Sequence, residues 1–176
     1  KALGIDEKLI QDVIRKEKRE YYSYLERIVE IYSDTDFQRY VLVVADSYYA
    51  FPLTRFLAND LGWITHLTAI NDIETDEERE AYLKKFEKIN SETKPEVIFE
   101  ENAGAILKEV RKSWPLSPAF VVGSGIERSL AQKIGAGFLA VAFPVSNRVV
   151  LNKGYTGFRG GLTLIEDLIS QLVSAR

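Results

Sequence analysis

The segment with the clearest potential for ligand chemistry is Gly-Ser-Gly-Ile-Glu-Arg at residues 123–128. It lies between an apolar strand and a predicted helix, so the backbone amides at the start of that helix could receive an anion. Gly123, Ser124, Gly125 and Arg128 are therefore candidate anion-binding residues. A tight structural turn is the alternative, because two glycines without the rest of a dinucleotide fingerprint are a weak signal.

The long loop predicted at residues 144–161 is the second candidate site. Its glycines and its X-Pro bond impose special backbone conformations, and long loops often serve in binding. Arg148 could pair with a carboxylate, a phosphate or an acid on another subunit. Tyr155 is a candidate binding or interface residue of the same loop. From spacing alone, a functional and a structural role for this loop remain equally open.

Metal-binding and catalytic patterns are sparse in this sequence. His66 is the only histidine, and the chain contains no cysteine, so the usual zinc ligand sets cannot form. Residues 72–101 hold eleven carboxylates against five basic side chains, which is typical of the solvated face of a helix. Ser124 has no nearby base and no nucleophile-elbow spacing around it. We assign no catalytic residue and no metal ligand.

Composition excludes several classes of protein. The 176 residues carry a formal net charge of -3, whereas nucleic-acid binders normally have a basic surplus. No apolar run approaches the length of a transmembrane helix, and the first residues lack a secretory pattern. We therefore expect a cytoplasmic protein.

The absence of cysteine excludes disulfides, thiolate nucleophiles and a locally ligated iron-sulfur cluster. The absence of methionine suggests a fragment of a longer product.

Hydrophobic periodicity predicts the elements that must position these segments. A long amphipathic helix is expected at residues 6–33, before the first strand. Five apolar strands are predicted at residues 40–45, 63–70, 95–99, 119–122 and 137–143. Helices are predicted between and after them at residues 49–61, 75–89, 103–114, 127–134 and 162–173. Residues 1–176 are therefore predicted to form a single α/β domain.

The predicted architecture is a Rossmann-like, open, mainly parallel five-stranded sheet, with helices on both faces and a long N-terminal helix before it. Ligands bind such sheets beyond the carboxyl ends of the strands. The loops of interest are consequently residues 46–47, 71–72, 101–102, 123–125 and 144–161. Asp46, at the end of the first strand, could bind a ligand hydroxyl, but capping the next turn is a commoner role for aspartate.

Three motifs in fixed order resemble a known family. They occupy residues 121–128, 142–148 and 154–157, and an apolar helix follows them. Together they resemble the C-terminal domain of nitrogenase component 1 subunits and their relatives. Those relatives include the molybdenum-iron protein chains, the cofactor-assembly scaffold chains and the dark-operative protochlorophyllide reductase chains. The correspondence is strongest over residues 119–173.

The resemblance implies a subunit of an oxygen-sensitive reductase built from three similar α/β domains. In this family, metal clusters lie between domains, paired chains form heterotetramers, and an ATP-dependent reductase protein delivers electrons. The cluster cysteines lie mostly in the N-terminal parts of the chains. The resemblance thus predicts that this segment is the last domain, without cofactors of its own, and that an iron-sulfur or metal cluster belongs to the full-length parent.

Two positions depart from the pattern of the catalytic molybdenum-binding subunit. There a histidine that ligates the cofactor directly precedes the Gly-Tyr-x-Gly element, whereas here Lys153 occupies that place. A protonated lysine is a poor metal ligand. Asn147 stands where β-type and scaffold chains commonly have an aspartate. The resemblance therefore favours a β-like or divergent homologue.

Three functions follow from these observations. The first is the C-terminal domain of a nitrogenase component 1-like oxidoreductase subunit, with a structural and inter-subunit role and no activity in isolation. The second is an anion- or nucleotide-binding α/β module that uses the turn at residues 123–125 and Arg148. The third is a metal-cofactor assembly scaffold, which shares the first fold and transfers its cluster.

Overall fold

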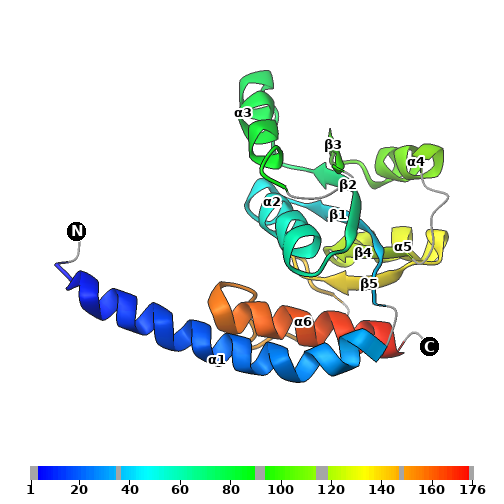
Figure 1. The fold of residues 1–176 in the computed structure, drawn as a ribbon. Coiled ribbons are helices and arrows are strands. Elements are labelled where there is room, and N and C mark those ends of the chain that lie inside the picture. The colour runs from blue at the N-terminus through cyan, green and yellow to red at the C-terminus, as the bar shows by residue number, and fades with distance from the viewer. Residues whose placement is uncertain (1–3, 35–36, 90–93, 114–118, 147–148, 175–176) are drawn as a thin grey trace. The chain divides into compact units, whose positions relative to one another are not determined.

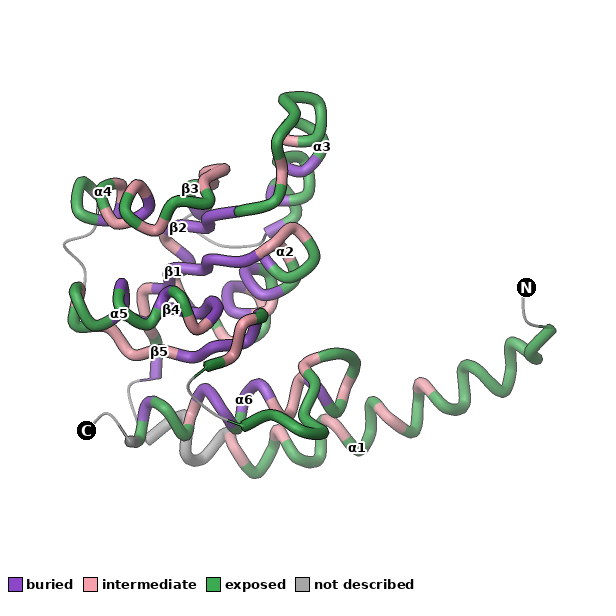
Figure 2. The backbone as a smooth tube through the Cα atoms, turned by 180° about the vertical axis from the view of Figure 1, so that it is seen from behind, coloured by how far each residue is buried: buried purple, intermediate pink, exposed green. Residues whose placement is uncertain are grey.

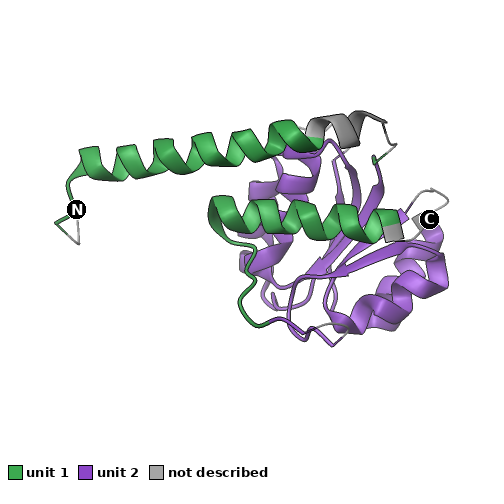
Figure 3. Ribbon diagram, turned by 90° about the horizontal axis from the view of Figure 1, so that it is seen from below, with its two compact units in different colours: residues 1–37, 151–173 green, residues 38–150, 174–176 purple. Residues whose placement is uncertain are grey.

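The computed structural model describes residues 4–34, 37–89, 94–113, 119–146 and 149–174. The chain forms two compact units, one of residues 1–37 with 151–173 and one of residues 38–150 with 174–176 (Figure 3). We describe each unit by itself. The predicted loop residue Arg148 and the predicted helix end at Trp114 lie outside the described residues.

The larger unit is built on a sheet of five parallel strands (Figure 1). The strands are β1 (Tyr40–Ala45), β2 (Ile64–Ile70), β3 (Glu96–Phe99), β4 (Ala119–Gly123) and β5 (Gly137–Ala140). They lie in the order β3-β2-β1-β4-β5. The predicted Rossmann-like sheet is thus confirmed, and its uninterrupted apolar strands are explained by burial on both faces.

Helices cover both faces of this sheet. They are α2 (Ser47–Arg55) with its π-helical continuation η1 (Phe56–Asp60), α3 (Asp76–Phe86), α4 (Ala103–Ser113), and α5 (Arg128–Ile134) after the 3₁₀ turn η2 (Gly125–Glu127). Alternate residues of β1 enter different cores: Leu42 and Val44 pack with residues of α4 and α5, and Ala45 packs with residues of α2 and α3. The buried strands lie between more exposed helices in Figure 2.

The smaller unit contains the predicted long N-terminal helix, α1 (Glu7–Asp34), and the closing helix α6 (Gly157–Ser174). Tyr21 of α1 packs against Phe158, with 5.8 Å between ring centroids, and against the backbone of Gly161. A Cβ atom on Gly161 would lie 3.3 Å from the Tyr21 ring, so the bare backbone permits this close approach. Arg159 Nε also lies 3.7 Å from Glu17 Oε2.

Several predicted boundaries differ from the structure, among them the start of α6 and the end of β5. Helix α6 begins at Gly157, five residues before the predicted start at Leu162, because the glycines at its start allow tight packing instead of a loop. Strand β5 ends at Ala140, three residues before the predicted end. The amides of Val141 and Ala142 both donate to the Gly123 carbonyl, at 2.8 and 3.0 Å, so the regular ladder stops there.

Gly137 provides a direct test of the β4–β5 contact. A Cβ atom at this position would lie 2.5 Å from the Phe120 ring, which is fully buried. We expect Gly137→Ala to lower the free energy of unfolding by about 1–3 kcal/mol, measured by urea denaturation, because the core must shift. Gly154→Ala is the control, since a Cβ atom there meets nothing within 4 Å. An equal loss in both variants would contradict this account.

Candidate functional site

The strand order changes direction between β1 and β4, so the loops after these two strands flank the expected ligand crevice. From β1 the chain builds β2 and β3 on one side, and β4 and β5 follow on the other. The structure thereby brings residues 46–47, 123–128 and 141–146 to the carboxyl edge of neighbouring strands.

The loop after β1 is closed by the side chain of Asp46. Its Oδ1 accepts hydrogen bonds from the amides of Tyr48 and Tyr49, at 2.9 and 3.1 Å, and caps α2. A carboxylate therefore already occupies the position that an anion would take at this helix N-terminus. Ser47 then links this loop to the end of β2, because its amide and hydroxyl donate to the Asp72 carboxylate at 2.7 and 2.9 Å.

Tyr82 of α3 holds the first turn of α2 from the other side. Its hydroxyl donates to the Ser47 carbonyl and accepts the Phe51 amide at 3.1 Å. The pKa of Tyr82 is raised to about 12, chiefly by burial and with smaller contributions from the carboxylates of Asp72 and Asp46. The amide of Phe51 acts in the opposite direction on this pKa.

The turn after β4 is satisfied by its own side chains. Glu127 Oε2 accepts both the amide and the hydroxyl of Ser124 at 2.7 Å, and Ser124 Oγ accepts the Ile126 amide at 3.2 Å. This reciprocal capping box is buried. The Glu127 amide donates to the Ser124 carbonyl at 3.2 Å. The buried carboxylate thus lies where sequence analysis predicted a bound anion.

Gly125 joins this turn to the loop after β5. Its amide donates to the Pro144 carbonyl at 2.6 Å, and a Cβ atom on Gly125 would overlap Ser146. In this structure every amide from Ser124 to Glu127 therefore has an acceptor within the protein. Arg128 begins α5 with an exposed side chain. Anion binding at residues 123–128 stays a prediction, and it would require this turn to rearrange.

Tyr155 and Lys153 both contact Asp167, within the smaller unit. The Tyr155 hydroxyl donates to Asp167 Oδ2 at 2.7 Å, and Lys153 Nζ lies 3.0 Å from Asp167 Oδ1. Asp167 is buried on α6. Sequence reasoning missed Asp167, although a buried-helix pattern interrupted by an acid was an available signal.

The described residues do not fit a metal cluster. They contain no group of three or more histidine, cysteine, aspartate or glutamate side chains that could hold a metal ion. The full sequence has no cysteine to ligate iron-sulfur clusters. His66 lies in β2 at a bulge, since Val41 pairs with Thr65 and Leu42 pairs with Leu67. Lys153 forms an ion pair with Asp167.

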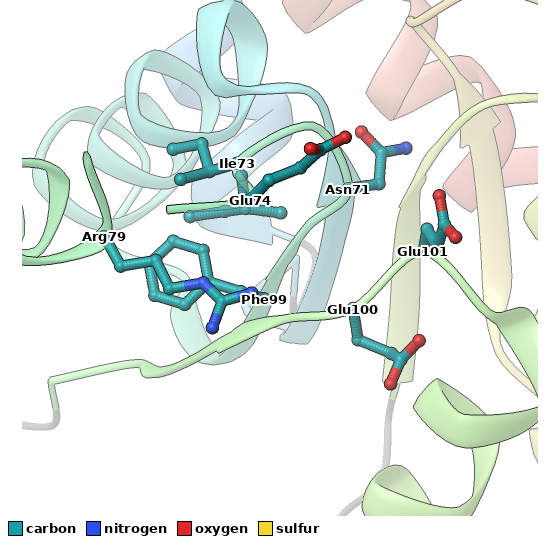
Figure 4. Close-up of a pocket in the computed structure, with 8 residues that line it drawn as sticks. Asn71, Ile73, Glu74, Arg79, Phe99, Glu100 and Glu101 are labelled. Carbon is teal, nitrogen blue, oxygen red and sulfur yellow. The ribbon is translucent and has the colours of Figure 1, made fainter. Parts of the chain in front are cut away.

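A pocket of about 360 Å³ lies near the crevice, at the ends of β2 and β3 (Figure 4). Its lining comes from the two loops that follow these strands and from the start of α3. Sequence analysis placed loops 71–72 and 101–102 at this edge without predicting a pocket. The pocket depends on how α3 packs beside β3, which the spacing of residues does not specify.

Tyr82 predicts a pH dependence that can be measured. Its pKa in the folded chain lies above the value of 10.0 in the unfolded chain, so folding favours the protonated hydroxyl. This contribution to stability is complete below about pH 10 and is lost as the pH rises towards about 12. We expect Tyr82→Phe to be less stable at neutral pH by about 1–3 kcal/mol, because two buried hydrogen bonds lose their partner.

The difference in unfolding free energy between wild type and Tyr82→Phe should shrink over that alkaline range, as followed by urea denaturation. Tyr48→Phe is the control, because the Tyr48 side chain is 84% exposed. A constant difference between wild type and Tyr82→Phe from neutral pH to about pH 12 would contradict the assignment.

No helix in the described part of the chain combines the length and the apolar character needed to cross a bilayer. This agrees with the absence of long apolar runs in the sequence.

Comparisons with known proteins identify the family. A family model described as "Nitrogenase component 1 type Oxidoreductase" matches residues 1–173. No curated protein matches the sequence significantly. A solved structure titled "Nitrogenase Cp1 at pH 6.5" is similar, with a TM-score of 0.69 and 13% sequence identity. The match covers 92% of this chain and 33% of that chain, so this chain spans about a third of its length.

At such low identity the structural likeness shows the fold alone. The family match extends over nearly the whole sequence, from residue 1 to residue 173. The chain therefore belongs to the nitrogenase component 1 type oxidoreductase family.

Proposed function

We propose that this chain is the packing domain of a nitrogenase component 1-like oxidoreductase subunit, and that it contributes no cluster ligands. The family match supports the oxidoreductase parent, and the chain spans about a third of the solved chain it resembles. The chain has no cysteine, and iron-sulfur clusters are held by cysteine thiolates. This supports a parent protein in which other domains ligate the clusters. In this proposal, the parent supplies the clusters and this domain supplies surfaces that hold the assembly together.

The observation that carries the proposal is the exposed apolar face on the first half of α1. Leu9, Ile10 and Val13 follow one another at one-, three- and four-residue spacing within the first two turns of α1 and are 58%, 39% and 54% exposed. Residues at this spacing share one side of a helix. A row of half-exposed aliphatic side chains favours burial against a partner, at about 25 cal/mol for each Å² removed from water. Arg15 and Lys18 lie on the opposite side of α1, whereas Lys16 and Glu20 follow Leu9 and Val13 on the same side.

We infer that the partners are other domains of the same subunit and a homologous subunit in a heterotetramer. An ATP-dependent reductase protein would deliver electrons to clusters elsewhere in the assembly, in the cytoplasm. The Lys153–Asp167 ion pair supports this assignment, because an ammonium group held by a buried carboxylate is a poor candidate for a metal ligand. The domain by itself is expected to have no reductase activity.

The proposal predicts that iron is present in the native complex and absent from the isolated chain. We expect the protein purified from its native host without oxygen, together with its associated chains, to contain iron and acid-labile sulfide. The 176-residue chain produced alone should contain neither and should reduce no substrate with a low-potential electron donor. Substrate reduction by the chain alone would contradict the proposal. A native complex that contains no iron or sulfide would contradict the redox role of the parent, although it would not affect the assignment of the fold.

The α1 face predicts an effect on assembly. We expect Leu9→Gln combined with Val13→Gln to weaken association with the partner chains at least tenfold, measured by analytical ultracentrifugation, because two apolar contacts are lost. Arg15→Gln combined with Lys18→Gln is the control, since it changes the opposite side of the same helix. Helix content, followed by circular dichroism, should be unchanged in both. Equal weakening by the two double variants would argue against the apolar face.

A further inference from the structure

The lining of the pocket at the ends of β2 and β3 includes no residue of the α1 face or of the turns at residues 46–47 and 123–128. Its volume is about 360 Å³, enough for a small organic molecule. Ile70, Ile73 and Phe99 provide apolar lining. Asn71 and three glutamates provide polar lining, and Arg79 is its single basic residue. Figure 4 shows Asn71, Glu74 and Glu101 towards one end, with Arg79 stacked beside Phe99 at the other.

Some of these groups already have partners. Glu100 Oε1 accepts the Asn102 amide at 2.8 Å, and Asn102 in turn caps α4. The Arg79 guanidinium lies 5.3 Å from the centre of the Phe99 ring, with its Nη1 3.4 Å from Asp76. Arg79 therefore forms part of the wall, and its buried Nε has no hydrogen-bond partner among the described residues. Glu74 and Glu101 form no hydrogen bond or ion pair with any residue in the described ranges.

The charge balance decides which ligands the pocket can attract. Three carboxylates face one guanidinium, and residues 72–101 as a whole hold eleven acids against five basic residues. Phosphates and carboxylates would be repelled by this field. The described acids also do not converge closely enough to form a metal site. An organic cation is attracted by the negative charge and does not need the closely spaced ligands of a metal ion. Its charge can be shared between separated carboxylates, and its carbon chain can lie on the apolar lining.

We propose that this pocket binds a small organic cation, an amine with a short aliphatic chain, whose ammonium groups pair with Glu74 and Glu101 while its carbon chain lies along Ile73 and Phe99. Amines of this kind carry several donors and no acceptor, which matches carboxylate and amide oxygens at the open end. The mixed lining, apolar with a few convergent polar groups, is typical of small-molecule sites. No residue of the proposed packing face takes part.

Isothermal titration calorimetry with spermidine tests this site. The wild-type chain should bind spermidine saturably, and affinity should fall as salt rises, because exposed carboxylates are screened. Glu74→Gln combined with Glu101→Gln should weaken binding at least tenfold. The matched control is Glu77→Gln combined with Glu80→Gln, which removes the same charge from exposed positions of α3 outside the pocket. The control should change affinity less than twofold.

Backbone amide shifts of the wild-type chain provide a readout that needs no variant. Spermidine should shift the amides of Asn71, Glu74 and Glu101 more than those of Glu77 and Glu80. Equal loss of affinity in the two double variants would mean diffuse attraction to an acidic surface and would overturn the proposal. Absence of saturation up to about 10 mM spermidine would also overturn it, as would binding of adenosine or inorganic phosphate in its place.

Discussion

All five strands of the sheet run in the same direction, and this constraint determines most of the remaining structure. Parallel neighbours cannot be joined by tight hairpins, so each connection must cross a face of the sheet as a helix or longer loop. Both faces are then covered, which explains the apolar strands and the two separate cores on either side of β1. It also brings the loops after β1, β2, β3 and β4 to one edge.

At that edge, the protein fills its own helix N-termini with side chains. Asp46 caps α2, Thr75 caps α3, and Asn102 accepts the first amides of α4. Glu127 and Ser124 do the same at the turn before α5. Helix N-termini attract anions through unpaired amides, so these caps remove the feature that makes such an edge suitable for phosphate. What remains at the edge is mostly acidic, which is why an organic cation suits the pocket beside β2 and β3.

The smaller unit is held together by close packing between helices and by contacts to one buried acid. Its glycines let α6 approach Tyr21 of α1 closely, and Asp167 fixes both Lys153 and Tyr155 to α6. Residues that resemble a cofactor-binding element in a relative are used here for internal contacts, while the first half of α1 keeps an apolar face exposed. These features agree with a domain that supports an assembly.

The sequence by itself determined the element order, the parallel sheet, the long first helix and the family, because these depend on hydrophobic periodicity and on short ordered motifs. It also suggested that Asp46 caps a turn, since a short aspartate side chain reaches only local amides. Only the tertiary structure decided how the edge is used. It joined Lys153 and Tyr155 to Asp167, Gly125 to Pro144 and Tyr82 to Ser47, and it formed the pocket beside β3. Those contacts join residues distant in sequence, and no local pattern encodes which groups they bring within hydrogen-bonding distance.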